Sequence, residues 1–209
     1  MRVFENAHPL EILRWAGEEY GDGLVVTASF GDAVLVHLVS RAIPDADVVL
    51  LDTGYLFAET QWYAEHLREA YGLNLRIVGP PEDAPRDLWQ TDTDACCAVR
   101  KVDPLNRALE GMDAWISGLR RDQSPSRAST PKLAWDAKHG LWKANPLADW
   151  SEPDVWRYIV ENDLPYNPLH DQGYSSIGCT HCTLPGAGRD GRWAGLEKSE
   201  CGMHAPVAG

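Results

Sequence analysis

The sequence predicts an α/β fold built on a parallel twisted sheet with helices on both faces. Short apolar runs of strand length alternate with longer helical segments, and the runs lack the alternation of a strand that has one face in water. At 209 residues the chain has the length of one domain with a full hydrophobic core. We therefore expect a single domain over residues 1–209, with an α/β core over about 1–160 and an irregular tail over about 161–209.

The first part of the chain alternates helices and strands. A helix is expected from His8 to Tyr20, because Pro9 suits its first turn and Gly21 its end. Residues 79–95 contain three prolines and many acids, which predict a loop. The same reasoning predicts strands at 24–28, 47–51, 73–78 and 114–118, and helices at about 32–42, 58–71 and 98–109.

The last predicted helix begins after Ser151, which is a favourable N-cap, and should turn Val155, Ile159 and Val160 inward. From Asn162 onward the sequence is rich in Gly and Pro and shows little periodicity. A tail of this length is unusual unless a metal site holds it or it takes part in chemistry.

Charge and composition exclude some functions. The formal net charge of −12 argues against binding to nucleic acid or to an anionic membrane, which both need an excess of Lys and Arg. A small anionic ligand needs only a local basic pocket. The start of the sequence runs into acidic and polar residues rather than a long apolar stretch, so we expect a cytoplasmic protein.

The five cysteines fall into two groups. Cys96, Cys97, Cys179 and Cys182 form an adjacent pair and a C-x-x-C pair, a set that predicts a metal or cluster site ahead of inert thiols. On spacing alone, iron-sulfur and zinc remain open. Cys201 stands alone near His204, where it is either a nucleophile or a stray thiol.

Two turns follow predicted strands and could meet a nucleotide. Ser29 lies after the first strand and Asp52 after the second, so both fall at the carboxyl edge of the sheet. Free N–H groups at the start of the following helix favour an anion there. An ordinary capped turn remains the alternative.

The chain resembles the assimilatory adenylyl-sulfate reductases. The resemblance runs from about Ser29 to His204 and rests on these motifs: Cys96-Cys97-x-x-Arg100-Lys101, Gly118-Leu119-Arg120-Arg121-Asp122-Gln123-Ser124, Cys179-x-x-Cys182, Arg189-x-x-Arg192-Trp193 and Glu200-Cys201-Gly202-Met203-His204. One departure is the short turn at residues 28–32, where relatives usually have a longer, serine-rich loop.

The resemblance implies a fold like the adenine nucleotide alpha hydrolases, related to the ATP-pyrophosphatases. It also implies a 4Fe-4S cluster on Cys96, Cys97, Cys179 and Cys182, with Cys201 as the nucleophile. Ser29 and Asp52 then correspond to nucleotide-binding turns. The residues that correspond to contacts of the phosphosulfate are Lys101, Arg127, Arg189, Arg192 and His204.

The implied reaction is reduction of adenosine 5'-phosphosulfate to sulfite and AMP, in sulfate assimilation and cysteine biosynthesis, with a separate thioredoxin as electron donor. Three alternatives are a 3'-phosphoadenylyl-sulfate reductase, an ATP-pyrophosphatase or tRNA-thiolating enzyme on the same fold, and a non-catalytic metal-binding module. The second needs a Ser-Gly-Gly loop and a basic RNA surface, and the sequence lacks the loop. The third leaves Cys201 without a role.

Overall fold

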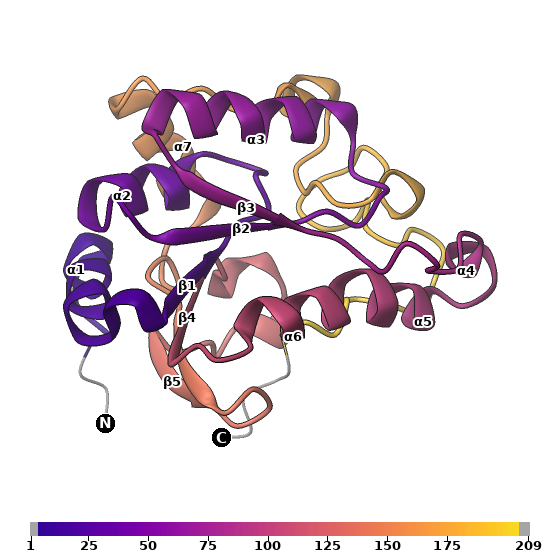
Figure 1. Ribbon diagram of the computed structural model, residues 1–209. Helices are drawn as coiled ribbons and strands as arrows, with labels where there is room; N and C mark the ends of the chain where they lie inside the picture. The colour runs from indigo at the N-terminus through magenta and orange to yellow at the C-terminus, as the bar shows by residue number, and fades with distance from the viewer. Residues whose placement is uncertain (1–3, 205–209) are drawn as a thin grey trace.

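The computed structural model describes residues 4–204, which form one six-stranded sheet between layers of helices (Figure 1). The strands lie in the order β3-β2-β1-β4-β6-β5. All neighbours are parallel except β5 and β6, which form an antiparallel pair at one edge. The strands are β1 (Leu24–Thr27), β2 (Asp47–Leu51), β3 (Asn74–Val78), β4 (Ala114–Ser117), β5 (Leu133–Asp136) and β6 (Leu141–Ala144).

Side chains that alternate along the central strands build a separate core on each face of the sheet. Val26 and Ile116 belong to the larger core, whereas their neighbours Val25 and Trp115 belong to the smaller one. The larger core packs against α1 (Pro9–Tyr20), α2 (Val34–Ala42), α3 (Ala58–Tyr71) and α7 (Glu152–Glu161), and the smaller against α6 (Asp103–Leu109). The predicted α/β fold with helices on both faces is confirmed.

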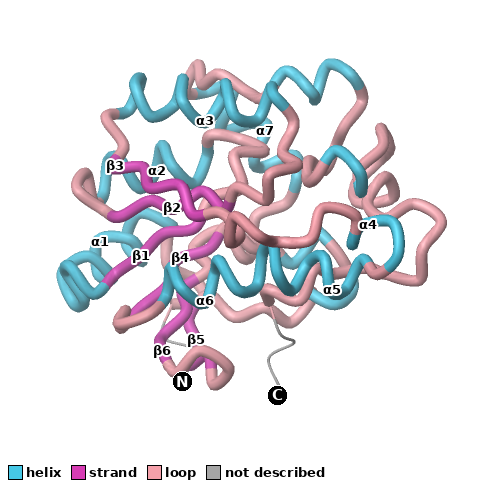
Figure 2. The backbone as a smooth tube through the Cα atoms, turned by 45° about the vertical axis from the view of Figure 1, so that its right-hand side comes forward, coloured by secondary structure: helices cyan, strands magenta, loops and turns pink. Residues whose placement is uncertain are grey.

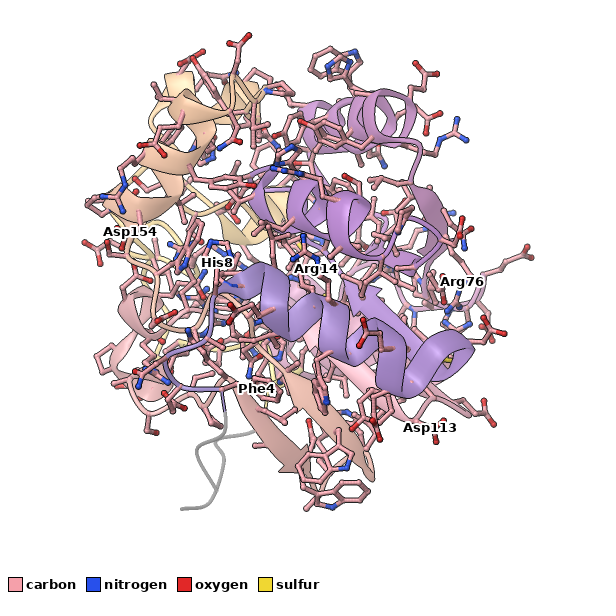
Figure 3. The ribbon with its side chains drawn as sticks, turned by 90° about the vertical axis from the view of Figure 1, so that its left-hand side faces the viewer. Phe4, His8, Arg14, Arg76, Asp113 and Asp154 are labelled. Carbon is pink, nitrogen blue, oxygen red and sulfur yellow. The ribbon has the colours of Figure 1, made fainter. Side chains whose placement is uncertain are left out.

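Local signals in the sequence set several helix ends. His8 caps α1 by accepting from the backbone N–H of Leu10, and Pro9 follows as its first residue (Figure 3). Ser151 caps α7 through a reciprocal bond with Asp154. On α7 the prediction for Val160 is wrong: Val155 and Ile159 are buried, but Val160 is 77% exposed because it lies on the opposite side of the helix.

Residues 79–95 are not entirely a loop as predicted. They end in two short helices, α4 (Leu88–Thr91) and α5 (Thr93–Cys97), and Asp92 caps α5 by accepting from the N–H groups of Asp94 and Ala95. The next segment, Ala98–Val102, is a π-helix that leads directly into α6. A π-helical turn of this kind often marks a functional site.

The hairpin of β5 and β6 was not predicted. Its strands are short, and Trp135 and Trp142 pair across it with their rings 5.7 Å apart and largely in solvent. Exposed tryptophans and a buried Lys143 obscure the apolar pattern by which strands are recognised.

The predicted irregular tail is confirmed as mostly loop up to residue 204 (Figure 2), and its residues 205–209 lie outside the described part of the chain. It contains two short 3₁₀ helices, η5 (Pro168–Gln172) and η6 (Thr180–Cys182). An isolated bridge joins Leu56 to Cys179, so the tail is tied to the segment that follows β2. Within residues 4–204, the longest apolar helices fall short of what a membrane crossing requires.

Candidate active site

A cavity of about 300 Å³ opens at the carboxyl edge of the sheet. The turns after β1, β2 and β4 line it, as expected for a ligand site in an open α/β fold. Its volume falls at the lower end of the range for small-molecule sites. On the other side it is closed by the C-terminal segment, which brings Cys201, Met203 and His204 to its wall.

The turn after β1 is held in a strained shape. Phe30 has a φ of 53°, which is rare for a residue with a side chain, and it is almost fully buried. Its carbonyl accepts from Nδ2 of Asn167 at 3.2 Å, and the carbonyl of Gly31 lies 2.9 Å from Nε2 of His170. These contacts from the tail keep the turn, including Ser29, at the cavity wall.

The turn after β2 presents Thr53 rather than Asp52 to the cavity. Oδ1 of Asp52 accepts from the N–H of Gly54 at 2.8 Å, so this carboxylate stabilises the turn. The hydroxyl of Thr53 also lies 3.3 Å from Sγ of Cys179. The sequence pointed to the correct turn, but Asp52 is not among the residues that line the cavity.

The four cations predicted from the sequence, Lys101, Arg127, Arg189 and Arg192, all line this cavity. They come from the π-helix, from the 3₁₀ helix η4 (Pro125–Arg127) and from the tail. Two of them are already paired: the carboxylate of Glu200 accepts from Nη2 of Arg127 at 2.6 Å and from Nη2 of Arg189 at 3.3 Å. With Arg120, the cations that line the cavity outnumber the acids Asp32, Asp122 and Glu152, so an anionic ligand is favoured there.

The charge states of these paired groups follow from their surroundings. Burial alone would raise the pKa of Glu200, but the hydrogen bond and charge of Arg127 outweigh it and hold the pKa below its usual range. Burial, followed by the charge of Arg127, lowers the pKa of Arg189 to about 10. Glu200 and Arg189 therefore remain charged near neutral pH.

The guanidinium of Arg192 is positioned by Ser176 and Trp193 and has room because residue 178 is glycine. Nη1 of Arg192 donates to Oγ of Ser176 at 3.3 Å, and the guanidinium lies 4.7 Å from the ring centroid of Trp193. A Cβ on Gly178 would stand 2.5 Å from Cζ of Arg192, so only glycine leaves room for this arrangement. Nε of Arg192 is buried without a partner among residues 4–204.

Cys201 lies where the basic cavity meets the other cysteines. It is only 8% exposed, and it packs with Cys97 and Trp193 while also lining the cavity wall. A thiol at the wall of a cation-lined cavity is well placed to react as a thiolate. The structure thus brings together the predicted nucleophile and the predicted cations.

The other four cysteines converge on a second, much smaller cavity next to the first. Cys96 and Cys97 end helix α5, Cys179 directly precedes η6 and Cys182 ends it. All five cysteines of the chain are free thiols, and burial raises the pKa of Cys97 to about 11. Arg100 and Lys101 line the same cavity.

The chemistry of the side chains around this cavity can be compared with what a metal cluster requires. Cysteine thiolates are the usual ligands of iron–sulfur clusters. Four free thiols converging on one cavity beside two cations fit such an anionic cluster.

One pair of residues at the site was not predicted from the sequence. Lys143 of β6 lies against His204, with Nζ of Lys143 2.9 Å from Nδ1 of His204. The two residues are 61 positions apart, and the sequence between them gives no signal of this contact. The ammonium nitrogen of Lys143 is 4.0 Å from the ring centroid of Trp115, on which His204 also stacks. The only clue in the sequence is a single cation within the short apolar run at 141–144.

The chain is similar in sequence to known proteins. Residues 23–185 match the model of the phosphoadenosine phosphosulfate reductase domain. The chain is 47% identical to the adenosine 5'-phosphosulfate reductase of Streptomyces coelicolor, over 97% of this chain and 91% of that protein. It is also 47% identical to adenosine 5'-phosphosulfate reductase 1 of Bacillus subtilis, over 93% of this chain and 90% of that protein.

Solved structures show the same fold. A phosphoadenylyl-sulfate reductase from Candida auris superposes with a TM-score of 0.75 at 30% identity, over 86% of this chain and 91% of that one. An FMN adenylyltransferase from Candida glabrata superposes with a TM-score of 0.62 at 16% identity, over 85% of this chain and 64% of that one. The second similarity concerns the fold alone.

Proposed function

The chain belongs to the phosphoadenosine phosphosulfate reductase family, and from this premise we propose that it reduces adenosine 5'-phosphosulfate to sulfite and AMP in sulfate assimilation. The observation that carries the proposal is the position of Cys201 at the wall of a cavity lined by Lys101, Arg189 and Arg192. The relatives that are 47% identical bear the name adenosine 5'-phosphosulfate reductase.

In the proposed first step, the thiolate of Cys201 attacks the sulfur of adenosine 5'-phosphosulfate. An S–S bond forms, the bond from sulfur to the phosphate oxygen breaks, and AMP leaves with that electron pair. The sulfonate remains on the enzyme as Cys-S-SO₃⁻. Negative charge gathers around the reacting sulfur, and Lys101, Arg189 and Arg192 stand at the cavity wall to stabilise it.

A thioredoxin is the proposed electron donor. One of its thiolates attacks Sγ of Cys201 and expels sulfite, and its second thiol resolves the mixed disulfide. The two thiols supply both electrons of the reduction, so the step needs no other reductant. We also propose a cytoplasmic location, because free thiols such as the five cysteines here persist in a reducing compartment.

We further propose that Cys96, Cys97, Cys179 and Cys182 hold a 4Fe-4S cluster. When bound, the cluster would supply a structural tie and an electrostatic contribution beside Lys101. The support is the convergence of the four free thiols on one cavity that Arg100 and Lys101 also line. Those two cations would offset the negative charge of a thiolate-bound cluster.

The second candidate function is reduction of the 3'-phosphorylated nucleotide. The observation that favours it is the solved relative from Candida auris, which is a phosphoadenylyl-sulfate reductase. The relatives with higher identity carry the name of the unphosphorylated substrate. We therefore place adenosine 5'-phosphosulfate first.

The test is a sulfite-release assay with each nucleotide in turn and reduced thioredoxin as donor. We expect sulfite from adenosine 5'-phosphosulfate, with a much lower kcat/KM for the 3'-phosphorylated form. The reverse order of kcat/KM would favour the second candidate. No sulfite from either nucleotide, in protein that retains its metal centre, would rule out both.

A further inference from the structure

We infer that the carboxylate of Glu200 occupies the place of the anionic substrate on Arg127 and Arg189, and that substrate binding must displace it. This inference rests on the proposed function and goes beyond it, because it gives a role to a residue outside the expected substrate contacts. The residue that would be displaced directly precedes the nucleophile Cys201.

The contact between Glu200 and Arg127 uses both carboxylate oxygens. Nε of Arg127 donates to Oε1 at 2.8 Å and Nη2 donates to Oε2 at 2.6 Å. This two-point geometry is the one by which arginine also binds phosphate and sulfate. The same two nitrogens therefore cannot bind Glu200 and an anionic group of the substrate together.

Arg189 shares the same carboxylate. Its Nη2 lies 3.3 Å from Oε2 of Glu200 and donates to the carbonyl of Ser199 at 2.9 Å. Hydroxyls of Ser124 and Ser126 also donate to Oε1, at 3.3 and 3.2 Å. Glu200 is thus held by an anion-binding set of donors drawn from two distant parts of the chain.

Partial burial strengthens the salt bridges of Glu200 with Arg127 and Arg189. The side chains of Arg127, Arg189 and Glu200 are 11%, 18% and 21% exposed, so water screens the pair only partly. Lys101 and Arg192 line the same cavity, and neither forms a salt bridge with a residue in the range 4–204. Two of the four cations thus become available to the ligand only when Glu200 leaves.

Displacement would also affect the nucleophile. Cys201 is 8% exposed in the arrangement in which Glu200 is bound to the arginines. Release of the carboxylate removes the side-chain contacts that hold Glu200, and leaves the backbone next to Cys201 held by the bonds to the carbonyls of Ser199 and Gly202. Substrate binding and loosening of this segment are therefore coupled. An anion with two charged groups competes for the arginines better than one with a single charge.

The experiment compares Glu200→Gln with wild type in two measurements. ADP is the probe, since it has two anionic groups like the substrate but no sulfur for Cys201 to attack. By calorimetry, Glu200→Gln should bind ADP about 5-fold or more tightly, because a competing carboxylate has been removed. Without nucleotide, peptide mass analysis should show faster alkylation of Cys201 by iodoacetamide in this variant.

Two further variants separate the loss of negative charge at Glu200 from other effects of the substitution. Glu197→Gln has the same change of charge on the same segment, but Glu197 is exposed, so both measurements should match wild type. Glu200→Asp keeps the charge and should bind ADP nearly as wild type does. If Glu200→Asp and Glu200→Gln shifted ADP binding equally, charge competition would not be the cause.

A purely supporting role for Glu200 predicts the opposite change in ADP affinity. If Glu200 only holds Arg127 and Arg189 ready for substrate, Glu200→Gln would bind ADP equally or more weakly, and the inference would be overturned. Unchanged alkylation of Cys201 would overturn the coupling to the nucleophile. Absence of sulfite from adenosine 5'-phosphosulfate in wild type would instead refute the proposed function, and ADP binding would still report on Glu200.

Discussion

Nζ of Lys143 and Nδ1 of His204 lie 2.9 Å apart and join strand β6 to the segment that carries Cys201. Both groups stack against Trp115, with the ring of His204 nearly parallel to the indole at 5.2 Å. Burial, followed by the charge of Lys143, lowers the pKa of His204 well below its usual range. His204 is therefore neutral at physiological pH, and a ring nitrogen can accept from Lys143.

Lys143 should make stability depend on pH in alkaline solution. Burial lowers its pKa to about 8, with Arg127 and Lys138 acting in the same direction and Asp136 against it. Between about pH 8 and 10.5 the unfolded chain binds more protons at this site than the folded one, so stability from this site rises with pH. The difference in unfolding free energy between wild type and Lys143→Met should therefore rise across that window.

Urea unfolding followed by tryptophan fluorescence would measure this difference at several pH values. Arg14→Met is a suitable control, because it removes an exposed cation on α1 that is not among the charges acting on Lys143. The difference in unfolding free energy between wild type and this control should stay constant across the same pH window. If the difference in unfolding free energy between wild type and Lys143→Met falls with rising pH, Lys143 is not the cause of the alkaline pH dependence.

Lys101→Ala should mainly lower turnover. Lys101 lines the proposed substrate cavity from the π-helix and forms no salt bridge with any residue of the described part of the chain. Its full charge can therefore act on the negative charge that develops at sulfur, and its loss should lower kcat/KM by roughly 10²-fold. Lys101→Arg, which keeps the charge, should recover part of the activity; full activity in Lys101→Ala would refute this role.

Cys97→Ser tests the proposed cluster. Wild-type protein purified without oxygen should be brown and contain iron and acid-labile sulfide in about equal amounts. The variant should lose most of both, and because Cys97 also packs against Cys201, the tail should become more sensitive to protease. Zinc without sulfide in wild type would contradict the cluster.

Parts of this structure could be predicted from sequence because local signals determine them. Pro9 and Gly21 bound α1, and Gly72 follows the end of α3 in the left-handed conformation. The spacing of the cysteines singled out two groups, which the structure places around two adjacent cavities. These features depend on neighbouring residues or on rare residue types.

The remainder depends on contacts between distant segments. Lys143 and His204 are 61 residues apart, and Arg127 and Glu200 are 73 apart. No local pattern reports such pairs, so the sequence could nominate Arg127 and His204 but not their partners. Val160 is a different case, because helical periodicity already places it off the face that Val155 and Ile159 share, and it is exposed.

The central claim is that Cys201 is the nucleophile, and the most direct test is the intact mass of protein mixed with adenosine 5'-phosphosulfate in the absence of thioredoxin. Wild type should gain one sulfite on Cys201, as peptide analysis would show, and release AMP in equal amount. Cys201→Ser should keep the proposed cluster and bind the nucleotide, yet gain no sulfite and release no AMP. An adduct on another cysteine, or undiminished AMP release from Cys201→Ser, would contradict the account.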